Sequence, residues 1–113
     1  MARLFHIVDP AVWAGVESEY RPESLANEGF VHLSYADQVQ GVANDRYRDA
    51  AALQVLEIDP GRLTDPIKVE DSYGKGIAFP HLYGPLPVAA VIAIHPLPRD
   101  RHETFTFAVD DPA

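Results

Sequence analysis

The sequence predicts a single small α+β domain, in which a strongly bent or split sheet of mixed or antiparallel strands is flanked by two helices. Three observations lead to this prediction. The chain has 113 residues, which is enough for one buried core and too few for two. Short strand-like runs recur along it, and two helix start signals interrupt them in the first half. We therefore treat residues 1–113 as one domain, with residues 96–113 as a candidate edge strand and frayed tail.

The first half of the chain alternates strand and helix patterns. Residues 3–8 are largely apolar and indicate a short strand. Asp9 is a good N-cap and Pro10 suits the first helical position, so a helix of about three turns is expected next. A second strand is expected at residues 29–34. A second helix is expected at residues 36–48, where apolar side chains recur near helical spacing.

The second half is richer in strands and turns. Residues 53–58 and 67–70 are strand candidates. The segment 79–87 contains three prolines, which remove backbone donors and fix φ, so we expect an extended surface segment there and not a central strand. Residues 88–95 have the pattern of the most buried strand, and residues 104–109 that of an edge strand.

The composition excludes several classes of protein. The chain has no cysteine, which rules out disulfides, thiolate metal sites and thiol nucleophiles and fits a reducing cytosol. The longest apolar run, residues 88–94, is far shorter than the roughly 20 residues that span a bilayer. The N-terminus lacks the apolar region of a secretory signal. We therefore expect a cytoplasmic protein without a membrane partner.

The charge pattern limits the ligands. The formal net charge is −8, and the few basic residues form no stripe, so duplex nucleic acid should be repelled. A small nucleotide-like ligand is still admissible, because a few backbone N–H groups and one arginine can bind a phosphate inside an acidic protein. The sequence does not indicate an oligomeric state.

Two short segments repeat one arrangement of side chains. Residues 31–34 read Val-His-Leu-Ser and residues 80–83 read Pro-His-Leu-Tyr, so each places a hydroxyl group two residues after a histidine. In an extended chain the two side chains of each pair lie on one side. Imidazole and hydroxyl groups can bind a ribose or polarise a leaving group. The candidate ligand-binding residues are therefore His32, Ser34, His81 and Tyr83.

A plainer interpretation of the first pair remains open. Ser34 is followed three residues later by Asp37, in an arrangement that resembles a capping box. His32 would then be a hydrogen-bonded core histidine, and Ser34 only the N-cap of the second helix.

Glu70 is the most interesting acid. It closes a strand just before the glycine-containing loop 71–76, which leads into the second histidine segment. A carboxylate there could stabilise an oxocarbenium ion or orient a ribose hydroxyl. The alternative is a solvated carboxylate at the end of a strand.

Other chemistries lack their signatures. The histidines have no tight ligand spacing, so no metal site is expected. Ser34 lacks the Gly-x-Ser-x-Gly elbow of a hydrolase, and no phosphate-binding or dinucleotide glycine motif is present.

The chain resembles a known bacterial family. Residues 28–34 (Glu-Gly-Phe-Val-His-Leu-Ser) and 79–86 (Phe-Pro-His-Leu-Tyr-Gly-Pro-Leu), with the elements between them, resemble the family called domain of unknown function 952. The resemblance extends to His95. It implies an ADP-ribosyltransferase-like fold, and the order of elements is also similar to the second half of RNA 2′-phosphotransferases.

The resemblance implies a function and roles. His32 would line a pocket for NAD or an ADP-ribose-like group, with Ser34 beside the ribose and nicotinamide. Tyr83 would be the stacking residue and Glu70 the acid, which makes Glu70 and His32 the candidate catalytic residues. The sequence has neither the usual order of His, Tyr and Glu in transferases nor the arginine cluster of the phosphotransferases. A non-catalytic module that binds a small ligand or a protein is therefore the alternative.

Overall fold

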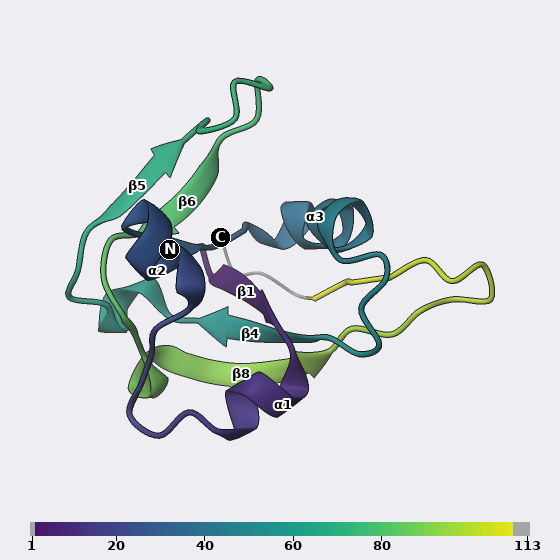
Figure 1. The fold of residues 1–113 in the computed structure, drawn as a ribbon, viewed down its shortest axis with the longest axis horizontal. Coiled ribbons are helices and arrows are strands. Elements are labelled where there is room, and N and C mark those ends of the chain that lie inside the picture. Colours follow the sequence, from purple (N-terminus) through teal and green to yellow (C-terminus); the bar gives the residue numbers. More distant parts are fainter. Residues whose placement is uncertain (1, 110–113) are drawn as a thin grey trace.

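The computed structural model describes residues 2–109 and contains two three-stranded antiparallel sheets (Figure 1). The main sheet has the order β1-β4-β8, with β1 at Leu4–Val8, β4 at Gln54–Ile58 and β8 at Val91–Pro96. The second sheet has the order β3-β6-β5, with β3 at Val31–His32, β6 at Phe79–Leu82 and β5 at Ile67–Glu70. The expected α+β domain is confirmed, and every strand pair is antiparallel among the described residues.

In the described part of the chain, one isolated bridge joins the two three-stranded sheets. Phe5 of β1 pairs with Ser34, just beyond β3, through two backbone hydrogen bonds of 2.8 Å each. The segment that begins as β3 of the second sheet therefore pairs with β1 of the main sheet two residues later. β2 (Glu19–Tyr20) and β7 (Leu86–Pro87) form a further, two-stranded sheet.

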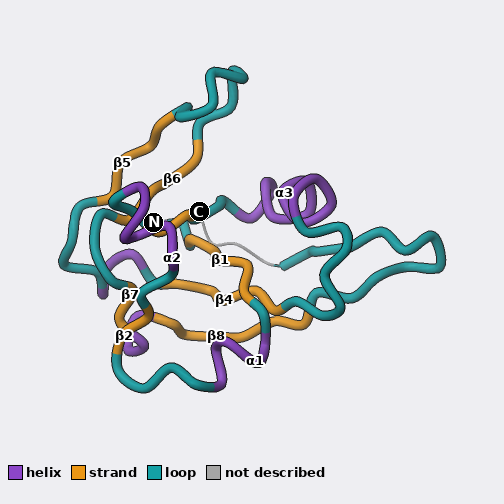
Figure 2. Tube along the Cα trace, viewed as in Figure 1, coloured by secondary structure: helices purple, strands orange, loops and turns teal. Residues whose placement is uncertain are grey.

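The helices are short and lie around the sheets (Figure 2). The α-helices are α1 (Pro10–Ala14), α2 (Glu23–Glu28) and α3 (Val39–Arg46). The 3₁₀ turns are η1 (Ala36–Gln38), η2 (Pro60–Arg62) and η3 (Val88–Ala90). None of the helices within residues 2–109 has the length and apolar character needed to cross a membrane.

The buried side chains form two clusters because the strands alternate between two apolar faces. The first cluster brings together residues of both three-stranded sheets: Leu4, Val8, Val31, Leu33, Leu56, Ile58, Leu82, Leu86 and Ala90. The second lies between the other face of the main sheet, α3 and the C-terminal segment: Phe5, Ile7, Val39, Ala43, Leu53, Val55, Leu97 and Phe105. Each three-stranded sheet thus contributes one face to the shared first cluster.

The helices near the N-terminus differ from the prediction. The helix after Asp9 has 5 residues and not three turns, because Gly15 is its C-cap. Tyr20, within the reach of a three-turn helix from Pro10, instead lies in β2 and pairs with Leu86. A helix that the sequence did not predict, α2, follows and ends at Glu28, with Gly29, whose φ is 90°, as its C-cap.

The prediction that the proline-rich segment 79–87 is not a central strand was wrong for residues 79–82. Residues 79–82 form β6, the central strand of its sheet. Pro80 is tolerated because it lies at the end of the short ladder with β3, where only one donor is lost, and its carbonyl still accepts from Leu33 N at 3.0 Å.

The two C-terminal strand predictions also need correction. β8 starts at Val91 and is an edge strand, with Ile92 and Ile94 exposed, so an all-apolar run was mistaken for a buried one. Residues 104–109 form no strand beyond one bridge at Phe105. The side chain of Asn44 in α3 binds both the N–H and the carbonyl of Phe105, at 2.7 and 2.9 Å, in place of a ladder. The predicted fraying at 110–113 lies outside the described residues.

Candidate functional site

One face of the β3-β6-β5 sheet carries aromatic and titratable side chains. In the antiparallel registers His32 is opposite His81, and Glu70 is opposite Phe79. Opposed residues project from the same face, while Val31 and Leu82, the neighbours of the two histidines, point to the core. We call the set Phe30, His32, Glu70, His81 and Tyr83 the histidine face.

Glu70 is hydrogen-bonded to two other residues of the histidine face. Its Oε1 accepts a hydrogen bond of 2.6 Å from the Tyr83 hydroxyl and lies 3.0 Å from His81 Nδ1. The Tyr83 hydroxyl, followed by the His81 imidazole, lowers the pKa of the Glu70 carboxyl, and the same carboxylate raises the pKa of Tyr83. An ionised Glu70 requires a donor at His81, so the proton is on Nδ1. The carboxylate is therefore ionised and held in place by two donors.

His81 has one nitrogen without a partner. Its ring is 1% exposed and stacks on Phe30, with the centroids 4.0 Å apart and the planes 11° from parallel. Nε2 has no hydrogen-bond partner among the described residues. An unpaired buried polar atom costs about 1–3 kcal/mol, so this nitrogen is a local cost to the stability of the fold.

His32 lies next to this pair and is more accessible. Its ring centroid is 5.4 Å from that of His81, with the planes nearly perpendicular, and its side chain is 30% exposed. Its Nε2 lies 2.9 Å from Oε1 of Glu28, the last residue of α2. The left-handed Gly29 that follows turns the chain from α2 into β3, so Glu28 and His32 come together.

The backbone carbonyl of His32 is hydrogen-bonded to a buried histidine of the main sheet. His6 Nδ1 lies 2.6 Å from the carbonyl oxygen of His32. Burial lowers the pKa of His6 to about 4, so at neutral pH it is uncharged and donates this hydrogen bond. His6 thus supports the site without facing it.

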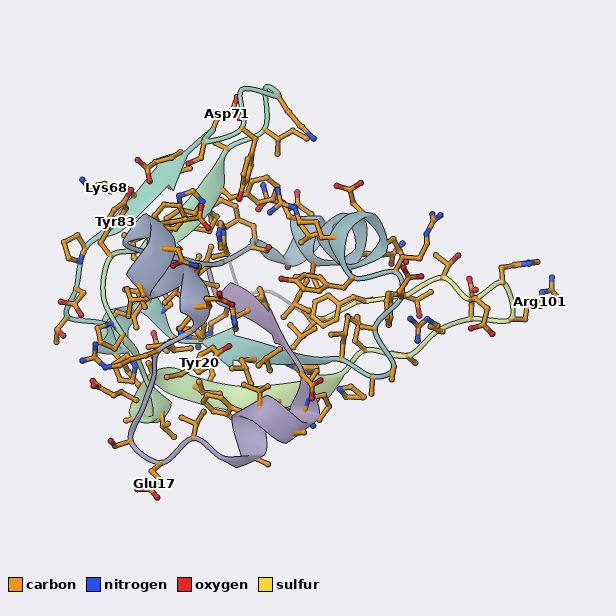
Figure 3. All side chains as sticks on the ribbon, in the orientation of Figure 1. Glu17, Tyr20, Lys68, Asp71, Tyr83 and Arg101 are labelled. Atoms are coloured by element: carbon orange, nitrogen blue, oxygen red, sulfur yellow. The ribbon has the colours of Figure 1, made fainter. Side chains whose placement is uncertain are left out.

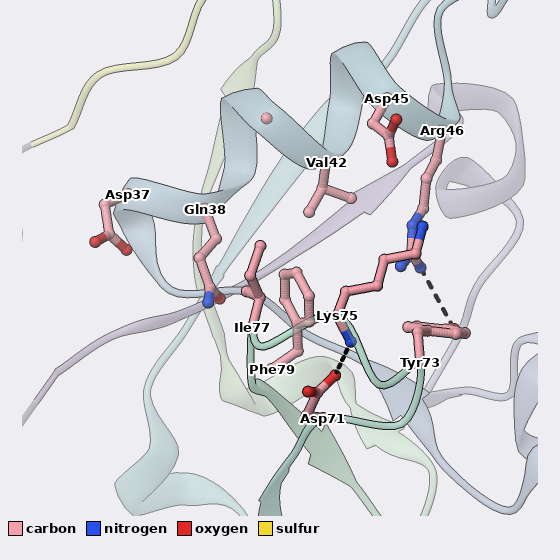
Figure 4. A pocket seen from close by; sticks show the side chains of 11 residues that line it. Asp37, Gln38, Val42, Asp45, Arg46, Asp71, Tyr73, Lys75, Ile77 and Phe79 are labelled. Carbon is pink, nitrogen blue, oxygen red and sulfur yellow. Dashed lines mark hydrogen bonds between the residues drawn. The ribbon is translucent and has the colours of Figure 1, made fainter.

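A cleft opens between α3 and the β5–β6 hairpin (Figure 4). Its volume is about 380 Å³, and we call it the hairpin cleft. The hairpin loop is ordered because the Asp71 carboxylate accepts from the N–H groups of Lys75 and Gly76, at 3.0 and 2.8 Å. From η1, the turn before α3, Gln38 Nε2 donates to the carbonyl of Ala78 at 2.9 Å. The loop therefore has hydrogen bonds of its own, and the chain just after it is bound to η1.

Tyr73 connects the hairpin cleft to the histidine face. The guanidinium of Arg46 lies 4.5 Å from the centroid of the Tyr73 ring. The Tyr73 ring is also within 15° of parallel to that of His32, with the centroids 6.4 Å apart. The cleft and the face are therefore neighbouring parts of one surface.

The structure brings together most of the residues that the sequence singled out. His32, His81, Tyr83 and Glu70 are joined by direct contacts. Ser34 is not part of this set. It is buried, its backbone pairs with Phe5, and no hydrogen bond links its hydroxyl to the histidine face among the described residues. It is also not the N-cap, because Tyr35 precedes the helical turn.

Sequence reasoning missed four residues of this surface. Phe30 had a usable signal, because a period of two places it beside His32. Tyr73 stood in the predicted loop, with no signal for its direction. Glu28 and Arg46 depend on how α2 and α3 pack, which local patterns do not contain. Within residues 2–109 no group of three or more His, Cys, Asp or Glu side chains could hold a metal ion.

Comparison with known proteins identifies the family. The family model described as "Protein of unknown function (DUF952)" matches residues 7–94. The chain belongs to the DUF952 family. The matched range contains every residue of the histidine face and of the hairpin cleft. This confirms the family predicted from the sequence, while the ADP-ribosyltransferase-like fold stays a prediction.

Solved structures of one bacterial protein are similar to this chain. The crystal structure of protein CC0527 from Caulobacter crescentus is 32% identical, covers 92% of this chain and 93% of that chain, and has a TM-score of 0.77. The solution NMR structure of CC0527 is 30% identical, covers 90% of each chain and has the same TM-score. Both are structural genomics targets. Among curated proteins, none matches the chain.

Proposed function

We propose that this DUF952 domain binds NAD or a related ADP-ribose-containing nucleotide at the histidine face and acts on the bond between the ribose and its base. The observation that carries the proposal is the contact of Glu70, His81 and Tyr83 with one another, next to the accessible His32. These groups supply an ionised carboxylate, a phenol and two imidazoles within one small area.

His32 and Glu70 are the groups that a ligand can reach. Their side chains are 30% and 35% exposed, whereas His81 is buried. The His32 imidazole can hydrogen-bond to ribose hydroxyls. The negative charge of Glu70 can stabilise positive charge at the anomeric carbon while the base departs.

The proposed reaction is a substitution at the anomeric carbon. The bond between C1′ and the base nitrogen breaks, and its electron pair goes to the pyridinium ring, which becomes neutral nicotinamide. Water or another nucleophile then adds to C1′ and releases its proton. Tyr83 and His81 act as positioning residues, because each donates a hydrogen bond to the carboxylate of Glu70.

A second candidate function is a module that binds the same ligand without reaction. It is favoured by the hydrogen bonds that Glu70 already makes. One oxygen of its carboxylate accepts from two donors, as is typical of a structural hydrogen-bond network. The two candidates share the ligand and differ in whether nicotinamide is released.

The first experiment measures binding. A ligand that binds only the folded protein raises the melting temperature, so NAD, ADP-ribose and nicotinamide should be compared by thermal denaturation and calorimetry. His32→Ala should abolish the shift. The matched control is His102→Ala, which removes an exposed histidine from the C-terminal segment. Absence of a shift with all three compounds would refute the proposal.

The second experiment separates the two candidates. Nicotinamide release from NAD is followed by proton NMR in the wild-type protein and in Glu70→Gln. Reaction predicts release that Glu70→Gln loses while NAD still binds. Binding by the wild-type protein without release favours the non-catalytic module.

A further inference from the structure

The hairpin cleft is chemically different from the histidine face. Val42, Ile77 and Phe79 give it an apolar lining, and Ile77 and Tyr73 are 54% and 43% exposed. Figure 4 shows these side chains directed into the space between α3 and the hairpin. We infer that the hairpin cleft binds the planar base of the nucleotide, stacked on Tyr73, while the ribose lies on the histidine face. This inference rests on the proposed function.

The orientation of Tyr73 supports a stacking role. Its ring is supported by Arg46, 4.5 Å from the centroid, and is nearly parallel to His32. A centroid separation of 6.4 Å from His32 is near the outer end of the range for aromatic pairs, so the two rings do not close on each other face to face. A base stacked on Tyr73 would therefore have its sugar close to His32.

Tyr83 is less suited to this role, although the family resemblance assigned it stacking. Its hydroxyl is bound to Glu70, and its ring centroid lies 4.6 Å from Lys68 Nζ and 5.3 Å from the ring of Phe30. Lys68 and Tyr83 lie side by side along the β5–β6 side of the molecule (Figure 3). Both tyrosine rings have a cation at similar distance, but the Tyr83 ring also has the Phe30 ring 5.3 Å away and its hydroxyl bound to Glu70, whereas the ring nearest to Tyr73, that of His32, is 6.4 Å away.

The polar groups of the cleft favour a base over a phosphate. Asp37, Asp45 and Asp71 all line it, and they outnumber the cations Arg46 and Lys75. Carboxylates accept hydrogen bonds from amide or amino N–H groups, which the carboxamide of nicotinamide and the exocyclic amine of adenine both offer. They repel a diphosphate, which should lie outside the cleft.

Two substitutions test the cleft without replacing a residue of the histidine face. Tyr73→Ala removes the stacking surface and should weaken binding of the base-containing ligand about 5- to 150-fold, the range for a stacked base. Tyr73→Phe should bind as wild type. The control is Tyr47→Ala, because Tyr47 is similarly exposed at 39% but does not line the cleft.

Gly41→Leu blocks the cleft from α3. A Cβ at Gly41 would meet no atom within 4 Å, and replacing glycine inside a helix favours folding, so both Gly41 variants should unfold no earlier than the wild type in thermal denaturation. Gly41→Ala, which adds one methyl group, is its control. We expect Gly41→Leu to weaken binding at least as much as Tyr73→Ala, and Gly41→Ala to have little effect.

The dissociation constants of NAD and ADP-ribose identify the base. If Tyr73→Ala weakens NAD alone, nicotinamide occupies the cleft; if it weakens both ligands equally, adenine does. Both outcomes support the inference. Wild-type binding of both ligands by Tyr73→Ala and Gly41→Leu overturns it but leaves the proposed function standing, whereas no binding by the wild-type protein removes both.

Discussion

His6 is a buried imidazole whose protonation the fold opposes. Burial lowers its pKa from 6.5 to about 4. The unfolded chain therefore binds more protons than the folded protein between these values, so the free energy of unfolding falls as the pH is lowered through this window. The contribution is complete above about pH 6.5. By linkage, the loss is about 2 kcal/mol between pH 7.5 and pH 5 and about 3 kcal/mol once His6 is fully protonated.

The matched variant is His6→Asn, whose amide can still donate to the carbonyl of His32 but does not titrate. Urea denaturation at several pH values should give a lower free energy of unfolding for this variant at neutral pH, since packing against Tyr20 is lost. Its decline between pH 7.5 and pH 5 should be about 2 kcal/mol smaller than that of the wild type. His102→Asn, at an exposed site, is the control. Equal declines in the wild type and His6→Asn would refute the reasoning.

Three further predictions concern single side chains. Tyr83→Phe removes the main cause of the low pKa of Glu70, so the carboxyl titration followed by NMR should move to higher pH; an unchanged midpoint would contradict the hydrogen bond. Gly84→Ala should destabilise by about 1–3 kcal/mol in urea denaturation, because its Cβ would lie 2.7 Å from the Cβ of Asp65. Gly29→Ala should cost about 1–2 kcal/mol in the same assay because φ is 90°; a wild-type midpoint would show that the turn tolerates a side chain.

Local patterns predicted the parts of the fold that depend on neighbours in sequence. The first strand, the strands at 54–58 and 67–70 and the second helix were all confirmed, because alternation and helical spacing are local properties. The central position of β6 was not predicted, since the cost of Pro80 depends on where the partner strand ends. The exposure of Ile92 and Ile94 likewise depends on which side of β8 is covered.

The candidate site was predictable for a related reason. A period of two placed each histidine and the hydroxyl after it on one side of its segment, and pairing of β3 with β6 then set His32 opposite His81. The same rule failed for Ser34, because the chain leaves β3 there to pair with Phe5. Tyr73 and Arg46 meet across a loop and a helix, and no sequence period relates two such elements.

The order of strands in the sheets has a consequence for synthesis on the ribosome. β1 ends at Val8, but its partner β4 begins only at Gln54. Likewise, β3 ends at His32 and its partner β6 begins only at Phe79. At ordinary elongation rates the first strand spends about 2–9 seconds without its partner. A nascent chain stopped before residue 79 would present unpaired edges to other chains, so we expect this protein to need chaperone protection until most of it has been made.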